Sequence, residues 1–512
     1  MDEPGLALER RARTIAELGD RRFDLLVIGG GIIGAGIAEA ATAHGLAVAL
    51  VDKGDFGGGT STASSKLIHG GLRYLRLGDV RLVREAHQER RTLMRVVAPH
   101  LVRRQPFLFP LYEGGSYRPW FVQTGILVYS TLARARLNGP VAVERARRLV
   151  PRLRGEALRS CALYADAVTN DGRLTLANVR GAADAGATVL NYAEVVALRG
   201  REGADVLVDG EAVRVSARAI VNASGPWVDH VRRLEDPCAE PSVRLSKGVH
   251  VLVEGGQDWA AALTIPHDKV RVTFAVPWQG MLLLGTTDTL HDGEPGNVSV
   301  TAEDVEQVLA EASVAVDALL PEDVRATFAG LRVLPGGSGE TAAARRETVF
   351  SRGPGGMVSI AGGKLTTYRR IALNALDRLR PDLGLSTLDR LPRPLPGAAG
   401  LSHVPFPDEL PPETRSHLLE LYGSLAADVL APARDDPSLL EPLVPGRPDL
   451  AAQALYAREQ EWAVTDDDVL RRRTTAWLAG SGAQAGTAER SSRSRAVAST
   501  SSDSVSGSIT TP

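Results

Sequence analysis

A glycine-rich segment near the amino terminus constrains the fold more than any other part of the sequence. The run 24–28, which is apolar from Leu25 onward, leads directly into GGGIIG at residues 29–34, and a second apolar run, residues 47–51, ends on Asp52. This order predicts a strand, a tight turn, a helix and a second strand that closes on an acid. The pattern indicates a βαβ unit whose turn binds a dinucleotide.

Each part of this segment has a physical role in such a site. Gly29 permits the tight turn, Gly31 lets the backbone approach a pyrophosphate at the helix amino end, and Gly34 allows close packing of helix and strand. Asp52 can accept hydrogen bonds from a ribose diol. A βαβ unit without a ligand is the alternative, and strand, spacing and terminal acid together argue against it.

Length, charge and cysteine content limit the classes of protein to which this chain can belong. A chain of 512 residues predicts about two to four domains. A net charge of -2 gives no electrostatic reason to expect nucleic acid as a partner. The cysteines are Cys161 and Cys238, which support neither a disulfide framework nor a cysteine metal site, so we expect no metal. Residues 1–20 lack a secretory apolar stretch, and we find no membrane span, so we expect a cytoplasmic location.

Strand-to-glycine junctions recur later in the chain. Residues 213–215 and the apolar run 219–221 predict two further strands, the second followed by Asn-Ala-Ser-Gly, and residues 357–363 end another strand on two glycines. Three separate segments that end strands in this way predict one parallel sheet that gathers three loops at its carboxyl edge. Between them, β-branched alternation predicts a largely antiparallel second domain.

We therefore expect an α/β fold with a discontinuous, Rossmann-like dinucleotide-binding domain, an antiparallel-sheet substrate domain and a helical carboxyl-terminal domain. The expected boundaries are an amino-terminal extension at 1–20, a dinucleotide-binding domain at 21–105 with 165–245 and 330–385, a substrate domain at 106–164 with 246–329, a helical domain at 397–480 and a disordered tail at 481–512.

Several longer motifs resemble one family. GGGIIGAG, TSTASSKLIHGGLRYL, NASGPWV, LSKGVHV, LLGTTD, AGLRVL and AGGKLTTYR occur in the order found in the FAD-dependent glycerol-3-phosphate dehydrogenases, and the chain is similar to that family over about residues 22–480. The resemblance implies non-covalent FAD and glycerol 3-phosphate as substrate. The implied reaction oxidises sn-glycerol 3-phosphate to dihydroxyacetone phosphate by hydride transfer to FAD, which a quinone reoxidises.

The resemblance also assigns substrate and catalytic residues. Arg73 with Tyr74 and Arg332 match family positions for phosphate binding, for which the planar guanidinium is well suited. The alternative for these arginines is surface or interdomain ion pairing. His250 is the expected general base, against the alternative of a hydrogen-bonded histidine in a buried strand. Lys364, where the third glycine loop opens its helix, is expected to contact substrate and flavin.

The remaining cofactor residues lie in the three glycine loops and in the hydroxyl-rich segment after Asp52. The expected cofactor contacts are Gly29, Gly31, Gly34, Asp52, Ser61, Ser64, Ser65, Ala223, Gly225, Gly363, Lys364, Leu365 and Thr366. For the three serines, helix capping is a further interpretation. His69 is expected to line the site without covalent flavin attachment. Asp52 departs from the glutamate that family members often carry, which shortens the reach of the carboxylate.

The sequence is compatible with more than one electron acceptor and with or without a membrane contact. Residues 118–129 are aromatic and apolar and are followed by Arg134 and Arg136, which is typical either of a core helix or of an interfacial helix on the inner face of the cell membrane. Alternatives to a quinone-linked dehydrogenase are an oxygen-using glycerol-3-phosphate oxidase, an amine or amino-acid oxidoreductase of the same fold, and a flavin-binding regulatory protein. Homodimer formation is a further open expectation.

Overall fold

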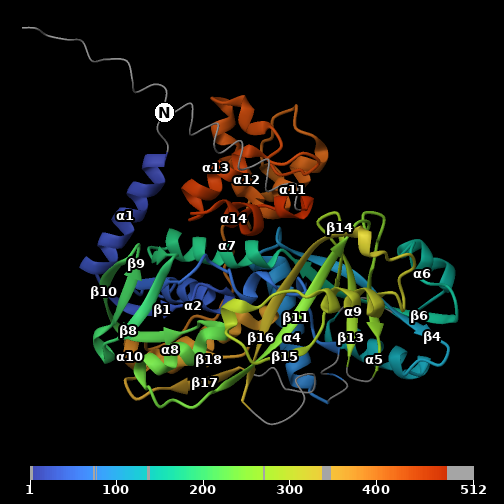
Figure 1. The fold of residues 1–512 in the computed structure, drawn as a ribbon, viewed down its shortest axis with the longest axis horizontal. Helices are drawn as coiled ribbons and strands as arrows, with labels where there is room; N and C mark the ends of the chain where they lie inside the picture. The colour runs from blue at the N-terminus through green and yellow to red at the C-terminus, as the bar shows by residue number, and fades with distance from the viewer. Residues whose placement is uncertain are drawn as a thin grey trace, which may run out of the picture.

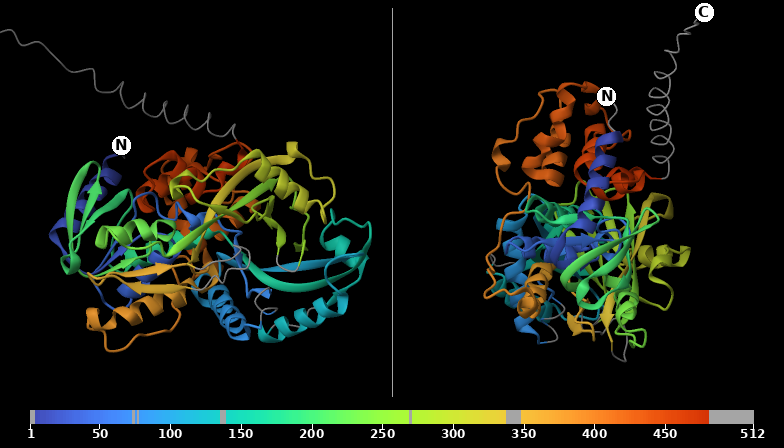
Figure 2. Two further views of the ribbon diagram at one scale, coloured as in Figure 1. Left: turned by 60° about the horizontal axis from the view of Figure 1, so that its bottom comes forward. Right: turned by 90° about the vertical axis from the view of Figure 1, so that its left-hand side faces the viewer.

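The computed structural model describes residues 4–72, 75, 78–134, 139–268, 271–336 and 348–480. Two sheets lie side by side along the long axis of the molecule, and a helical region at residues 397–480 covers one side (Figures 1 and 2). This arrangement is the α/β architecture that the sequence predicts.

The first sheet has the order β17-β18-β10-β1-β2-β7. Its strands are β17 Val349–Arg352, β18 Val358–Ala361, β10 Glu211–Asn222, β1 Arg22–Ile28, β2 Val48–Val51 and β7 Thr188–Leu190. Pairing is parallel from β18 to β7, and β17 is antiparallel to β18. Consequently, the three predicted glycine loops, which follow β1, β10 and β18, meet at one edge of the sheet.

Both faces of β1 are buried from Leu25 to Ile28, which explains the continuous apolar sequence of this part. Leu25 and Val27 belong to a core shared with α2 Ile32–Thr42, α7 Asp171–Asp184 and α10 Tyr368–Leu383. Leu26 and Ile28 point into a second core on the other face. The elements on that side are α1 Pro4–Asp20, α8 Val228–Glu235, β8 Ala193–Leu198 and β9 Ala204–Val208.

One strand expectation is wrong. The segments 213–215 and 219–221 belong to a single strand, β10, which pairs with β9 through Val215 and with β1 from Ser216 onward. They look separate in the sequence because Arg218, which lies between them, is exposed on the same side of the uninterrupted strand as Arg214.

The second sheet is largely antiparallel and has the order β15-β11-β14-β13-β12-β4-β6-β3, with β16 paired to β11 and β5 to β6. Its strands are β3 Leu67–Ile68, β4 Val102–Tyr112, β5 Pro140–Val141, β6 Leu158–Thr169, β11 Val243–Val253, β12 Ala262–Pro266, β13 Val272–Trp278, β14 Met281–Gly285, β15 Thr289–His291 and β16 Val324–Pro335. β12 and β4 pair in parallel. The helices of this part are α4 Val80–Thr92, α5 Pro119–Leu132, α6 Val143–Leu149 and α9 Ala302–Ala312.

The helical region contains α11 Pro412–Tyr422, α12 Ala426–Leu430, α13 Ala451–Gln460 and α14 Asp466–Asp468, followed by a π-helical turn at Val469–Arg473. These helices lie over α7 and next to α1 (Figure 1). The predicted disordered tail at 481–512 falls outside the described residues.

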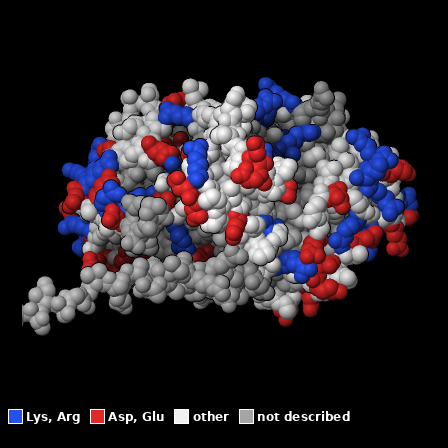
Figure 3. Space-filling view, turned by 90° about the horizontal axis from the view of Figure 1, so that it is seen from above, with Lys and Arg blue, Asp and Glu red and all other residues white. Residues whose placement is uncertain are grey.

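Basic and acidic side chains alternate over the described part of the face seen in Figure 3. Within the described ranges, no helix combines the length and apolarity needed to cross a bilayer.

Candidate active site

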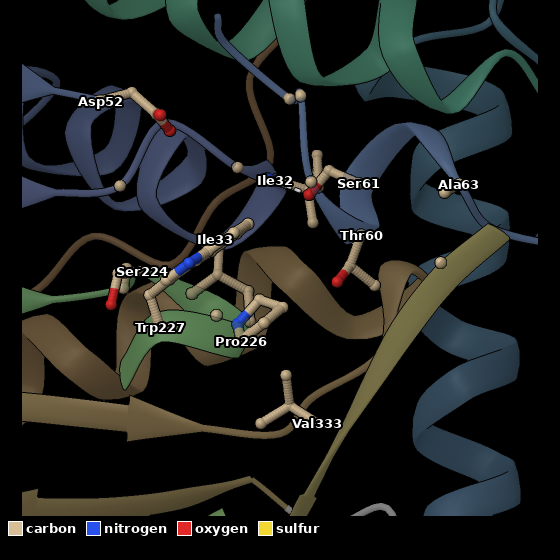
Figure 4. A pocket seen from close by; sticks show the side chains of 18 of the residues that line it. Ile32, Ile33, Asp52, Thr60, Ser61, Ala63, Ser224, Pro226, Trp227 and Val333 are labelled. Atoms are coloured by element: carbon tan, nitrogen blue, oxygen red, sulfur yellow. Dashed lines mark hydrogen bonds between the residues drawn. The ribbon is translucent and has the colours of Figure 1, made fainter. Parts of the chain in front are cut away.

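A cavity of about 700 Å³ lies at the carboxyl edge of the parallel sheet and reaches under strands of the second sheet. That volume falls within the range of roughly 300 to 1,000 Å³ that ligand pockets span. All three glycine loops contribute to its wall, together with the hydroxyl-rich segment 60–65. Figure 4 labels side chains next to the first glycine loop, in the second loop and in this segment. The cavity is therefore where the sequence predicts that the ligand binds.

The first glycine loop has the geometry of a phosphate cradle. Gly29 has φ +103°, a backbone conformation that side chains rarely adopt, and Gly31 caps the amino end of α2 on the cavity wall. A Cβ on Gly31 would lie 2.9 Å from Oγ of Ser61. Gly34 is on the packed side of the turn, where a Cβ would overlap the carbonyl of Gly29. Phosphate groups can thus approach the helix amino end closely.

Asp52 follows β2 and lines the cavity, but its carboxylate already has backbone partners. Oδ2 accepts from the amide of Gly30 at 2.6 Å and Oδ1 from the amide of Gly54 at 2.9 Å. Burial raises the pKa of Asp52 to about 6, although these two amides oppose the shift. The carboxylate of Asp52 is thus fixed by the first glycine loop and by the segment directly after β2.

The three predicted serines line the cavity, and each has a different partner. Oγ of Ser61 accepts from the amide of Ile32 at 2.9 Å, which ties the segment to the first turn of α2. Oγ of Ser64 donates to Asp171 at 2.7 Å, and Oγ of Ser65 lies 2.9 Å from Nε2 of His250. Capping of α2 therefore applies to Ser61, while the other two serines join the loop to the rest of the site.

Two neighbouring strands of the second sheet supply the other wall. In the antiparallel pair β11–β16, His250 lies opposite Phe328, Gly248 opposite Gly330 and Ser246 opposite Arg332. Residues two apart on a strand share a face, so these six project to the same side. The two glycines in the middle allow close approach: the guanidinium of Arg332 lies over Gly248 and Ala63 lies over Gly330, where a Cβ would clash with them. Both His250 and Arg332 line the cavity.

His250 is 3 % exposed, and its ring stacks on Phe328 with centroids 4.8 Å apart. Among the described residues, Nδ1 of His250 has no hydrogen-bond partner. Burial, and then the charges of Arg332 and Lys66, hold the pKa of His250 well below its usual value. The imidazole is consequently neutral at physiological pH and able to accept a proton.

The guanidinium of Arg332 is held by its neighbours in the cavity wall. Nη2 donates to Oγ1 of Thr286 at 2.7 Å and to the carbonyl of Thr287 at 2.9 Å, and Nη1 lies 3.7 Å from a carboxylate oxygen of Asp288. The side chain is 17 % exposed. These contacts place a fixed, partly buried cation at the cavity.

The second and third glycine loops complete the wall. Ala223, Gly225, Gly363, Lys364, Leu365 and Thr366 all line the cavity. Lys364 occupies the N-cap of the turn Leu365–Thr367, directly before α10. Oγ1 of Thr366 accepts from the amide of His69 at 3.1 Å, which brings His69 to the same wall. The structure thus joins segments that are almost 300 residues apart.

Two predicted phosphate-binding residues, Arg73 and Tyr74, lie outside the described residues. Every other predicted site residue except Gly34 lines the cavity. Within the described ranges, no group of three His, Cys, Asp or Glu side chains could hold a metal ion.

A buried ion pair that the sequence did not predict lies behind the site. Nζ of Lys66 lies 2.7 Å from Oδ1 of Asp171, with side chains 4 % and 1 % exposed, and 4.9 Å from the ring centroid of Phe328. Phe328 therefore contacts both the Lys66 ammonium and the His250 ring. The lysine directly after Ser64 and Ser65 was the available signal, but its partner is 105 residues away.

Comparisons with known proteins give the family. Residues 24–369 match the FAD dependent oxidoreductase family, and residues 361–490 match the C-terminal domain of alpha-glycerophosphate oxidase. Glycerol-3-phosphate dehydrogenase 2 of Mycobacterium tuberculosis is 37% identical, over 92% of this chain and 84% of that protein. D-erythritol 1-phosphate dehydrogenase of Brucella abortus is 34% identical, over 89% of this chain and 94% of that protein.

Among solved structures, glycerol-3-phosphate dehydrogenase from Bacillus halodurans complexed with FAD matches with a TM-score of 0.74 and 30% identity, over 92% of this chain and 89% of that chain. The phosphate cradle at Gly31, the acid at Asp52 and the cavity lined by all three glycine loops fit FAD. The chain is an FAD-dependent oxidoreductase and belongs to the family that contains the glycerol-3-phosphate dehydrogenases.

Proposed function

We propose that this enzyme oxidises sn-glycerol 3-phosphate to dihydroxyacetone phosphate and that a quinone takes up the electrons. The observation that carries the proposal is the shared face of β11 and β16, which sets the neutral His250 and the cationic Arg332 on either side of two glycines. Relatives named glycerol-3-phosphate dehydrogenase support the substrate.

The roles of the side chains follow from their surroundings. FAD, when bound, supplies the hydride acceptor. Nε2 of His250, on the side of Ser65, takes the proton of the substrate hydroxyl, and the depressed pKa keeps this nitrogen available. Arg332 binds the substrate phosphate, because its guanidinium can contact two oxygens at once. Lys364 adds a second positive charge at the loop before α10.

The cofactor contacts are part of the same proposal. The first glycine loop binds the pyrophosphate, Asp52 the ribose, and the loops at Gly225 and Gly363 the flavin end. We retain Arg73 and Tyr74 as phosphate contacts from the family resemblance. The sequence-based domain boundaries and a homodimer also remain proposals, and light scattering of the purified protein tests the latter.

A four-carbon polyol phosphate is the second candidate substrate. It is favoured by the relative named D-erythritol 1-phosphate dehydrogenase, which matches nearly as much of the chain. Both substrates would place a phosphate on Arg332, so they differ in the length of the carbon chain that must fit between this side chain and His250.

Helix α5 is the proposed contact with the inner face of the cell membrane. Val122, Ile126 and Tyr129 pack into the core, but the other side exposes Trp120, Phe121, Leu127 and Val128 at 62, 45, 47 and 42 %. The core and interfacial interpretations of this segment are therefore compatible, because they concern opposite sides of one helix. A membrane contact there would favour a quinone over oxygen as acceptor.

Flavin bleaching tests the substrate directly. Purified protein is mixed anaerobically with glycerol 3-phosphate, erythritol 1-phosphate, glycerol or glycine, and absorbance of the flavin band is followed. We expect rapid bleaching by glycerol 3-phosphate and little change with glycerol or glycine. Faster bleaching by the four-carbon phosphate would establish the second candidate, and bleaching by glycine would refute both.

A further inference from the structure

The loop after β2 is held by the helical region through one buried acid. Asp55 is 4 % exposed and comes three residues after Asp52. Oδ1 accepts from Nη2 of Arg473 at 2.8 Å and from Nδ2 of Asn191 at 3.0 Å, and Oδ2 accepts from Nη1 of Arg473 and Nε of Arg472. Two consecutive arginines of the helical region thus share a single carboxylate in the first sheet's loop.

Both arginines are fixed from the other side as well. Arg473 is fully buried and donates from Nε and Nη2 to the carbonyl of Glu461 at 3.0 and 2.6 Å. Nη2 of Arg472 donates to Oδ1 of Asp468 at 2.6 Å, and the hydroxyl of Tyr192 donates to the same oxygen at 2.7 Å. The guanidinium groups are therefore held by the helical region as well as by Asp55, which makes their contact with Asp55 rigid.

An aromatic contact also joins the helical region to the loop after β2. Phe56, next to Asp55, packs edge-to-face against Trp462 of the helical region with centroids 5.8 Å apart. The same ring fills the space beside Gly30, where a Cβ would clash with it. The helical region therefore touches the loop through two adjacent residues, one charged and one aromatic.

This loop forms the cavity wall at the ribose acid. Asp52, Lys53, Gly54, Asp55 and Gly57 line the cavity, and Arg472 lines it too. The amide of Gly57 donates to the carbonyl of Gly30 at 3.0 Å, so the loop also braces the phosphate cradle. A shift of the loop would displace the ribose and pyrophosphate contacts together.

We propose that Arg472 and Arg473 are positioning residues for FAD: through Asp55 they hold the loop after β2 in its cofactor-binding conformation. Because FAD and the arginine contacts require the same loop conformation, FAD binding and docking of the helical region strengthen each other, and the linkage acts in both directions. The proposal concerns cofactor retention alone and does not depend on which polyol phosphate is the substrate.

The test compares two buried charges of the same interface. Asp55→Asn removes the loop carboxylate that accepts from Arg472 and Arg473 of the helical region. Glu461→Gln removes a side-chain carboxylate that pairs with Arg173 of α7 at 2.6 and 2.7 Å. It keeps the backbone carbonyl of residue 461 that accepts from Arg473, so the contact of the arginine with the loop is retained. Full-length holoenzymes are diluted and FAD release is followed by flavin fluorescence, and thermal unfolding is recorded for each protein with and without FAD.

We expect the Kd of FAD to rise at least tenfold for Asp55→Asn and to stay within threefold of wild type for Glu461→Gln, although both variants unfold at lower temperature. An unchanged FAD Kd for Asp55→Asn, or equal losses in both variants, would overturn the proposal by showing a merely structural interface.

A second variant covers the case in which Asp55→Asn does not fold. Arg472→Gln removes the arginine on the cavity wall and leaves Arg473 in place, and Arg471→Gln is its control, because Arg471 is 44 % exposed and pairs with Asp467. FAD release should accelerate three- to tenfold for Arg472→Gln and remain at the wild-type rate for Arg471→Gln. Identical release rates for the two variants would contradict the proposed role.

Discussion

Replacing Arg332 with alanine should remove phosphate recognition while leaving the rest of the site in place. The side chain is 17 % exposed, and four hydrogen bonds to described residues join it to side chains and carbonyls of β11 and the segment after β14. These bonds fix the direction of the guanidinium in the free enzyme, so little ordering remains to be done when a phosphate arrives.

The expected loss follows from the burial of this charge. Truncating one partner of a buried charge pair costs about 2 to 5 kcal/mol, and each 1.4 kcal/mol corresponds to a factor of ten. We therefore expect kcat/KM for glycerol 3-phosphate to fall roughly 30- to 4,000-fold in Arg332→Ala. Arg332→Lys keeps the charge but loses the two-oxygen fork, so its loss should be intermediate.

Stopped-flow reduction of the flavin under anaerobic conditions measures this change. Arg325→Ala is the matched control, since Arg325 lies on the same strand, is 40 % exposed and pairs with Glu254 at 2.6 Å. Glycerol, which has no phosphate, serves as the second substrate, and its slow reaction should be equal in wild type and Arg332→Ala. A KM for glycerol 3-phosphate within threefold of wild type, in a variant that unfolds normally, would refute the assigned role.

Three further predictions concern other parts of the site. His250→Asn should lower kcat about 10²- to 10⁴-fold with KM nearly unchanged. The acid limb of the wild-type pH profile should lie below the usual histidine pKa of 6.5, because the pKa of buried His250 is lowered and the base stays neutral to lower pH. An acid limb above pH 6.5 would contradict this. Ribose hydroxyls donate hydrogen bonds to the ionised form of Asp52, whose pKa is raised to about 6, so the affinity for FAD should weaken as the pH falls below about 6. Fluorescence titration at several pH values measures this, and an FAD affinity that does not change with pH would count against the ribose contact. Lys66→Met leaves Asp171 buried without its cation and should cost about 3 to 5 kcal/mol of unfolding free energy in urea; a loss below 1 kcal/mol would show that the pair is dispensable.

Local sequence patterns were sufficient to predict the parallel sheet and the cofactor loops. The apolar runs at 25–28 and 47–51 had the length and composition of strands buried on both faces, and glycine at the strand ends marked the turns. The single strand β10 was divided in two, because its outward arginines resemble a break when only the sequence is seen. Such a pattern cannot distinguish a solvent-facing position within a strand from a turn.

Long-range polar contacts were beyond reach of the sequence. Ser65 and His250 were both singled out, but nothing in their local patterns joins residues 185 positions apart. The pairing of Asp55 with Arg473 spans 418 positions, and an aspartate after a glycine reads equally well as an ordinary turn residue. Ion pairs of this kind have no periodicity, so only the folded chain reveals them.

The position of β1 has a consequence for biosynthesis. This strand leaves the ribosome early, yet one of its hydrogen-bonded neighbours, β10, ends at Asn222, and the sheet then awaits β18, which ends at Ala361. Until those segments emerge, the nascent chain carries an apolar strand with an unpaired edge. Stalled translation products shorter than this should therefore aggregate or recruit chaperones, and flavin capture should begin only near the completion of synthesis.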